Sequence, residues 1–165
     1  MTAAQKRTIA AALKQFDLIA GAGSEESKKA CAMTMLAWVA GREWTDSPPC
    51  AHRLIRNVVV SVNDATGTTK VMRAAIVKAG KDGILDTWWV PDRVIVWAFS
   101  HPKGEKPGTK YAELLRALGR IAAWKGDKGL PPVLSGAVLS GARGFPYSGM
   151  PDGWKLNDAG AWVKS

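Results

Sequence analysis

The sequence predicts a mostly α-helical protein, a helical bundle of about six helices that ends in a short irregular or β tail. Apolar residues recur at helical spacing up to residue 129, and capping residues, prolines and glycines separate the recurring stretches. An apolar content of 47% in 165 residues is sufficient for a buried core. Beyond residue 129 the sequence changes to short segments rich in glycine and proline. We therefore expect a helical domain over 1–129 and a tail over 130–165.

The first helix is expected over 2–20, where Ile9, Leu13 and Phe16 fall on one face. Gly21-Ala22-Gly23 then ends the helix and serves as a linker. Because no strand precedes these glycines, we do not expect a phosphate-binding loop here.

The second helix is expected to begin at Ser24, whose hydroxyl can cap it, with Glu25 and Glu26 in the first turn. Gly41 marks its end. Its apolar stripe is expected to consist of Cys31, Met35, Trp38 and Val39.

The third helix is expected to begin with Ser47 as its cap and Pro48 in its first turn, and to end near Asn63 and Asp64. The short connector over 42–46 predicts that the second and third helices are antiparallel neighbours. The apolar face of the third helix is expected to comprise Ala51, Leu54, Ile55, Val58, Val59 and Val62.

A fourth helix is expected over 68–79, with Thr68 or Thr69 as its cap and Gly80 as its end. The residues 81–83 then read as a turn. The face of this helix is expected to comprise Val71, Met72, Ala75 and Ile76.

The fifth and sixth helices are expected over 91–100 and 109–124, begun by Pro91 and capped by Thr109. The segment 101–108 between them reads as a polar, mobile loop. In the sixth helix, Arg116 and Arg120 lie one turn apart on a face separate from the apolar stripe.

The tail has a five-residue period, in which Ser-Gly follows both Leu134 and Leu139, and it resembles a pentapeptide repeat. Two or three such steps cannot bury a core against one another. We therefore expect the tail to dock on the helical body or on a second copy of the chain, which makes a homo-oligomer an open alternative. The last residues predict a hairpin with strands over 154–156 and 161–163.

The net charge of +9 and the sequence pI near 9.8 favour an acidic partner, namely nucleic acid, a nucleotide or an acidic protein. No secretory leader and no membrane-spanning apolar run is evident, so we expect a cytoplasmic protein with no membrane partner. Cys31 and Cys50 are expected to be buried free thiols. Trp88 and Trp89 are adjacent and cannot easily both point inward, so one of the two is expected to be partly exposed.

Known catalytic and metal-binding patterns are missing from the sequence. The only cysteines and histidines are Cys31, Cys50, His52 and His101, and they lack the paired spacing of a structural zinc site. Neither a Gly-x-Ser-x-Gly elbow nor a phosphate loop occurs. We therefore expect no metal and no cofactor, and the sequence leans against an enzyme.

A binding site can instead be assembled around the second connector. His52, Arg53 and Arg56 share one side of the third helix and can offer guanidinium forks to phosphate. Trp44 can supply a stacking face. In this interpretation Trp44, Asp46, His52 and Arg53 form the wall of a small pocket, and Arg42 adds to the basic residues around it. The competing interpretation is a structural corner, in which Trp44 packs and Asp46 bonds nearby backbone amides.

The same connector belongs to a pattern that resembles uncharacterised actinobacterial proteins and proteins of the phages that infect them. That pattern runs Cys-x-Met-Glu, Gly-Glu-x-Trp-(Ser/Thr)-Asp-x-Pro-x-Cys and Asn-Asp, and it corresponds here to 31–33, 40–50 and 63–64. Thr34 stands in place of the first glutamate, and Arg42 intervenes before Glu43. The resemblance covers about a quarter of the chain and implies a phage association, not an activity.

The function that we expect is a small, non-enzymatic, phage-associated binding protein that engages an anionic partner through a basic helical face. The first alternative is a structural or assembly protein whose tail docks on neighbouring subunits. The second alternative is an enzyme that uses the acidic pair Glu43 and Asp46.

Overall fold

A computed structural model describes residues 8–101, 104–124, 154–156 and 162–164, the last two segments and residues 81 and 82 by their backbone alone. The chain divides into two compact units, Met1–Trp89 and Val90–Ser165. The described residues form six helices and are mostly helical, as predicted. The arrangement of all six helices as one bundle stays a prediction. The predicted boundary at 129/130 and the five-residue steps of the tail lie outside the described residues.

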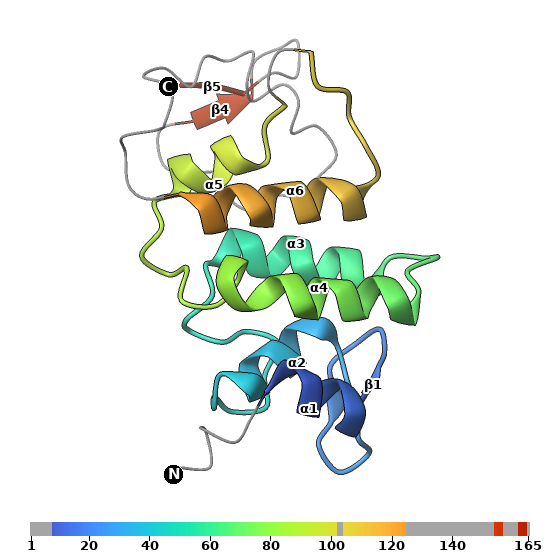
Figure 1. Cartoon of the computed structure of the whole chain (residues 1–165). Coiled ribbons are helices and arrows are strands. Elements are labelled where there is room, and N and C mark those ends of the chain that lie inside the picture. Colours follow the sequence, from blue (N-terminus) through green and yellow to red (C-terminus); the bar gives the residue numbers. More distant parts are fainter. Residues whose placement is uncertain (1–7, 102–103, 125–153, 157–161, 165) are drawn as a thin grey trace. The chain divides into compact units, whose positions relative to one another are not determined.

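The first unit consists of four helices and a small three-stranded sheet (Figure 1). Helix α2 packs against α3, α4 and α1. In the sheet, β3 lies between β1 and β2, parallel to β1 and antiparallel to β2. The elements are α1 (Ile9–Gln15), β1 (Asp17–Leu18), β2 (Gly23–Ser24), β3 (Lys29–Ala30), α2 (Ala32–Val39), α3 (Arg53–Asp64) and α4 (Lys70–Gly83).

Helix α1 ends earlier than predicted. Thr8 caps it by accepting a hydrogen bond from the amide of Ala11 at 3.1 Å. The chain becomes extended at Phe16, and Asp17 then pairs with Lys29 in the sheet. This strand pairing satisfies backbone groups that the helix would otherwise have used, so the expected continuation to residue 20 is wrong.

The predicted start of the second helix is also wrong. Ser24 lies in β2, and its hydroxyl accepts from the amide of Ser27 to close a tight turn. Cys31 is the actual cap, because its sulfur accepts from the amide of Thr34 at 3.3 Å. Serine favours turns as readily as helix caps, since both need a hydroxyl close to a free amide. Helix α2 is nearly all buried, which explains why an apolar stripe defined it poorly.

Helix α3 begins at Arg53, not after Ser47. Pro48 instead starts a turn, in which its carbonyl accepts from the amide of Ala51. The cap is His52, whose Nδ1 accepts from the amide of Leu54 at 3.2 Å. The predicted apolar face is otherwise confirmed, with Leu54, Ile55, Val58, Val59 and Val62 buried; Ala51 precedes the helix.

Helix α4 has the predicted cap, Thr69, but it continues through Gly80 to Gly83. Gly80 is buried against α2, and a β-carbon at this position would lie 2.6 Å from Cδ1 of Leu36. The glycine therefore allows the two helices to approach closely and does not end α4. Val71, predicted to lie on the apolar face, is 77% exposed, and Val77 is buried in its place.

The fully buried side chain of Asn63 joins three segments of the first unit. Its Oδ1 accepts from the amide of Ala32 at 3.1 Å, and its Nδ2 donates to the carbonyl of Ile19 at 3.0 Å. From α4, Arg73 donates to the backbone carbonyls of Asn63 and Leu18. The end of α3 is thereby fixed to the start of α2, to the β1–β2 loop and to α4.

The second unit contains α5 (Asp92–Ala98), α6 (Lys110–Ala123), β4 (Trp154–Leu156) and β5 (Trp162–Lys164). Helix α5 packs on α6, and β4 pairs with β5 in antiparallel register. Helix α5 is shorter than the predicted 91–100, because Pro91 is its N-cap and not its first residue, and Phe99 is its C-cap. Thr109 caps α6, as predicted, and the predicted hairpin is confirmed to within one residue. No described helix combines the length and the apolarity needed to cross a bilayer.

Replacing Gly80 with alanine is expected to destabilise the first unit by about 1–2 kcal/mol. The new methyl group would press on Leu36 and Ile84, which are both fully buried, and overpacking of about 1–3 kcal/mol exceeds the gain in helix propensity of about 1 kcal/mol. Gly119→Ala in α6 is the matched control, because no atom of the described residues lies within 4 Å of a β-carbon there. It should stabilise α6. Amide hydrogen exchange of α4 and α6 measures both effects, and stabilisation by Gly80→Ala would contradict the close approach.

Asn63→Ala is expected to cost about 2–4 kcal/mol, because each buried polar partner left unpaired costs about 1–3 kcal/mol. Asn57→Ala on the same helix is the control, since the Asn57 side chain accepts from the half-buried Arg56 and not from buried backbone. Its cost should stay below about 1 kcal/mol. Urea denaturation compares the two, and equal costs would show that Asn63 does not join the segments.

Candidate functional site

The connector between α2 and α3 is fixed to α3 by one arginine. The Nη2 of Arg56 donates to the carboxylate of Asp46 at 2.8 Å, and its Nε donates to the Asp46 carbonyl at 3.0 Å. A third bond reaches Asn57. The predicted bond from the Asp46 carboxylate to nearby backbone amides is therefore replaced by an ion pair. Three of the five N–H donors of Arg56 are thus used within the protein, and its side chain is 28% exposed.

Trp44 belongs to an aromatic cluster. Its ring centroid lies 5.2 Å from that of Phe16, which in turn lies 5.1 Å from that of Trp38. The indole N–H of Trp44 is buried and has no hydrogen-bond partner among the described residues. This packing corresponds to the structural-corner interpretation. Trp44 is half-buried, and its ring packs on Phe16 instead of presenting an open stacking face.

An open pocket of about 480 Å³ lies at the connector. A pocket of this size is within the range of small-ligand sites. Arg42 and Glu43 line it together, so it carries both signs of charge. Among the described residues its lining is Gly41, Arg42, Glu43, Thr45, Ser47 and Pro49. None of the four predicted wall residues, Trp44, Asp46, His52 and Arg53, is among these lining residues.

The structure divides the six predicted binding residues into two groups. Arg42 and Arg53 are exposed, and neither forms an ion pair with a described residue. Trp44, Asp46 and Arg56 are engaged in packing or in the ion pair described above, and His52 caps α3. The two carboxylates proposed for an enzyme also differ in their surroundings. Glu43 is exposed, whereas Asp46 forms an ion pair with Arg56.

The other residues of the resemblance pattern also have structural contacts. Cys31 caps α2. Buried Cys50 accepts, through its carbonyl, the amides of Thr87 at 2.8 Å and Trp88 at 3.3 Å. Asn63 joins three segments, as described above. In this chain, Cys31, Cys50 and Asn63 of the pattern therefore make contacts that hold the first unit together.

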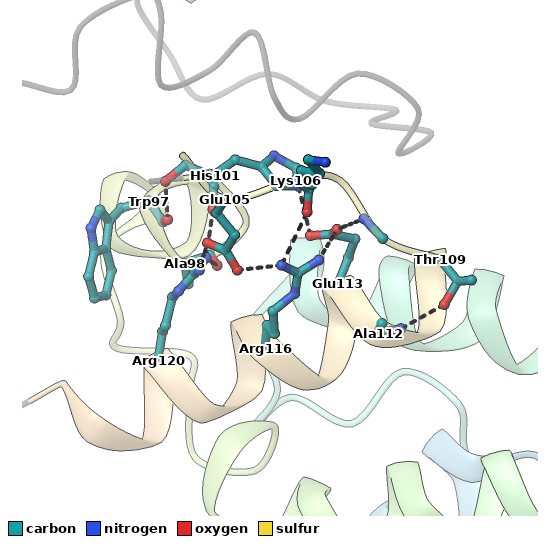
Figure 2. Close-up of polar contacts among 12 residues, drawn as sticks. Trp97, Ala98, His101, Glu105, Lys106, Thr109, Ala112, Glu113, Arg116 and Arg120 are labelled. Carbon is teal, nitrogen blue, oxygen red and sulfur yellow. Dashed lines mark hydrogen bonds and ion pairs between the residues drawn. The ribbon is translucent and has the colours of Figure 1, made fainter. Parts of the chain in front are cut away.

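A second cluster, which the sequence did not predict, lies between α5 and α6 (Figure 2). Its centre is Glu113, a buried carboxylate that accepts from Arg116 and from the amide of Gly108. The Nε2 of His101 lies 3.0 Å from the second oxygen of Glu113. Both ring nitrogens of His101 are buried, and neither meets the geometry of a hydrogen bond with a described residue.

Glu105 extends this cluster, because its two carboxylate oxygens accept from Arg116 and Arg120 respectively. Arg120 also donates to the carbonyls of Ala98 and Ser100, at 2.9 and 2.6 Å, at the end of α5. The loop between the helices was predicted to be mobile and polar, but Glu105 and Gly108 are hydrogen-bonded to α6, and His101 lies within ion-pair distance of Glu113. The one available signal was the i, i+4 spacing of Arg116 and Arg120, whose acidic partners sequence reasoning did not identify.

The pKa values of Glu113 and Glu105 are both lowered. Burial by itself raises the pKa of Glu113, but the amide of Gly108, His101 and Arg116 together outweigh burial, so that the pKa is lowered overall. For Glu105, burial again raises the pKa, and the two arginine partners outweigh it. Both carboxylates are therefore held in the charged form, as acceptors in a closed network. A general acid needs the opposite shift, so this cluster is suited to holding the two helices together.

No group of three or more metal-ligating side chains occurs among the residues that the structure describes. Comparison with known proteins adds no family to these observations. No protein-family model matches the chain, and neither a curated protein nor a solved structure matches it significantly.

Acid is expected to loosen the α5–α6 pair. Because the folded-state pKa values of Glu105 and Glu113 are lowered, their contribution is complete above the unfolded value of about 4.5 and is lost as pH falls through the lowered values. The protection factors of the α6 amides, which are exchange rates corrected for the intrinsic pH dependence of exchange, should therefore fall below about pH 4.5. Glu113→Gln should weaken α6 at neutral pH and flatten this pH dependence. An unchanged pH profile in the variant would show that Glu113 does not hold the helices.

Proposed function

We propose that this protein is a non-enzymatic binding protein whose first unit engages an anionic partner at the start of α3. The observation that carries the proposal is the division of the arginines. Arg56 is used internally by Asp46, whereas Arg42 and Arg53 are exposed and unpaired by any described residue. An exposed guanidinium keeps its forked donors available for phosphate or carboxylate oxygens.

The position of Arg53 supports the same proposal. Arg53 and Arg56 lie three residues apart on α3, so they share one side of the helix. The Arg56–Asp46 pair holds the connector against this first turn, and Arg42 belongs to the same connector. The exposed charges are thus presented on a fixed backbone, which reduces the entropy that binding must overcome. The phage association implied by the resemblance belongs to this proposal and is not needed for its test.

The chain carries a net charge of +9, which favours association with polyanions at low ionic strength. This field acts at long range, whereas Arg42 and Arg53 would make the contacts. The two contributions differ in their response to substitution, because a general field depends on total charge and a site depends on position.

Arg42→Glu combined with Arg53→Glu is expected to reduce affinity for an anionic probe by roughly tenfold or more, since contacts to an anion become repulsions. Binding should also weaken steeply with added salt if several phosphates are contacted. Fluorescence anisotropy with labelled oligothymidine, a labelled DNA duplex and a labelled polyglutamate peptide measures the affinities.

Lys14→Glu combined with Lys78→Glu is the control, because both lysines are exposed in the same unit and the change in net charge is identical. Circular dichroism checks that both double variants keep their helices. Equal losses in the two variants would assign binding to the general field and contradict the site, and no binding of any probe by the natural chain would contradict the proposed function.

A further inference from the structure

Two consecutive tryptophans at the end of the first unit are exposed to solvent. Trp88 is 67% and Trp89 is 55% exposed. The sequence predicted that one of the two would be partly exposed, and both are. Adjacent exposed aromatic side chains often mark an interaction surface, because they leave a large apolar area in water.

The backbone holds Trp88 beside the start of α3. Both Trp88 and Thr87 donate their amides to the carbonyl of Cys50, and the amide of His52 donates to Oγ1 of Thr87 at 2.9 Å. The Thr87 hydroxyl in turn donates to the carbonyl of Ile84 at 2.7 Å. Thr87 and Cys50 are both buried, so this junction is fixed. The exposed Arg53 follows His52 directly.

We propose that Trp88 and Trp89, together with Arg53, form a base-stacking platform for single-stranded nucleic acid. This inference rests on the proposed function and names the class of its anionic partner. It also moves the stacking role from Trp44, which packs on Phe16, to a tryptophan pair that is open to solvent.

The chemistry of the patch selects this partner among polyanions. A phosphate or a carboxylate needs only the arginine and gains nothing from an indole face. A duplex keeps its bases stacked inside, whereas a single strand presents base faces that stack on aromatic side chains while its phosphates meet cations. Exposed indoles beside an exposed guanidinium match both parts of a single strand.

The test uses the full chain and labelled oligothymidine, which has no stable structure of its own. Binding should quench tryptophan emission, and Trp88→Ala should weaken binding about tenfold, within the range measured for removal of a stacking residue. Trp88→Phe should retain most of the affinity, because it keeps an aromatic face. Affinity for a DNA duplex should be lower than for oligothymidine and should change little in Trp88→Ala.

Val71→Ala is the matched control, since Val71 is also a large, exposed apolar side chain of the first unit; it should not alter binding. The platform would be overturned if Trp88→Ala, Trp89→Ala and the double variant all left the affinity for oligothymidine unchanged. If the Arg42/Arg53 variant still weakened binding in that case, the proposed function would stand. Light scattering supplies a further check. A dimer of the natural chain that becomes a monomer in Trp88→Ala would overturn the platform in favour of a self-association surface.

Discussion

The first unit depends on the buried carboxamide of Asn63. A carboxamide can accept and donate at once, and here it accepts from the start of α2 and donates to the loop after β1. A carboxylate in its place would lose the donor, and an aliphatic residue would leave both backbone partners unpaired in the interior. The bond from the amide of Ala32 to Asn63 fixes the first turn of α2, and the rest of that almost wholly buried helix is held by packing on α1, α3 and α4.

Arginine is used in two distinct ways in this chain. Arg56, Arg73, Arg116 and Arg120 donate to backbone carbonyls and carboxylates within their own units, where the planar guanidinium replaces several separate contacts. Arg42 and Arg53 have no such internal partner among the described residues and remain exposed. Basic composition alone does not distinguish these groups. A large positive charge in a sequence therefore overstates the charge available to a partner.

The tryptophans also fall into a group that packs inside the first unit and a group that is exposed. Trp38 and Trp44 gather around Phe16, where edge and tilted contacts fill the space beside α1. Trp88 and Trp89 come after a junction whose hydrogen bonds are already complete. With Thr87 buried and bonded to the start of α3, the following side chains project beyond the core. Their exposure is a consequence of where the junction is fixed, and the backbone of Trp88 lies beside the start of α3, which carries the exposed Arg53.

The sequence by itself determined the helical class, the caps of α4 and α6, the apolar face of α3 and the hairpin of β4 and β5. These features depend on local chemistry, namely a hydroxyl before an apolar repeat or alternation around a turn. It misjudged Ser24, Ser47 and Gly80, because a serine can close a turn as well as a helix, and a glycine can permit close packing as well as end a helix. For the candidate site, the sequence grouped the residues of this connector and of α3 but could not separate Arg53 from Arg56. That separation required Asp46, ten residues away from Arg56, to meet it in space. The ion cluster of α5 and α6 and the exposure of Trp88 and Trp89 were likewise decided by the tertiary structure, since both depend on contacts between residues distant in the chain.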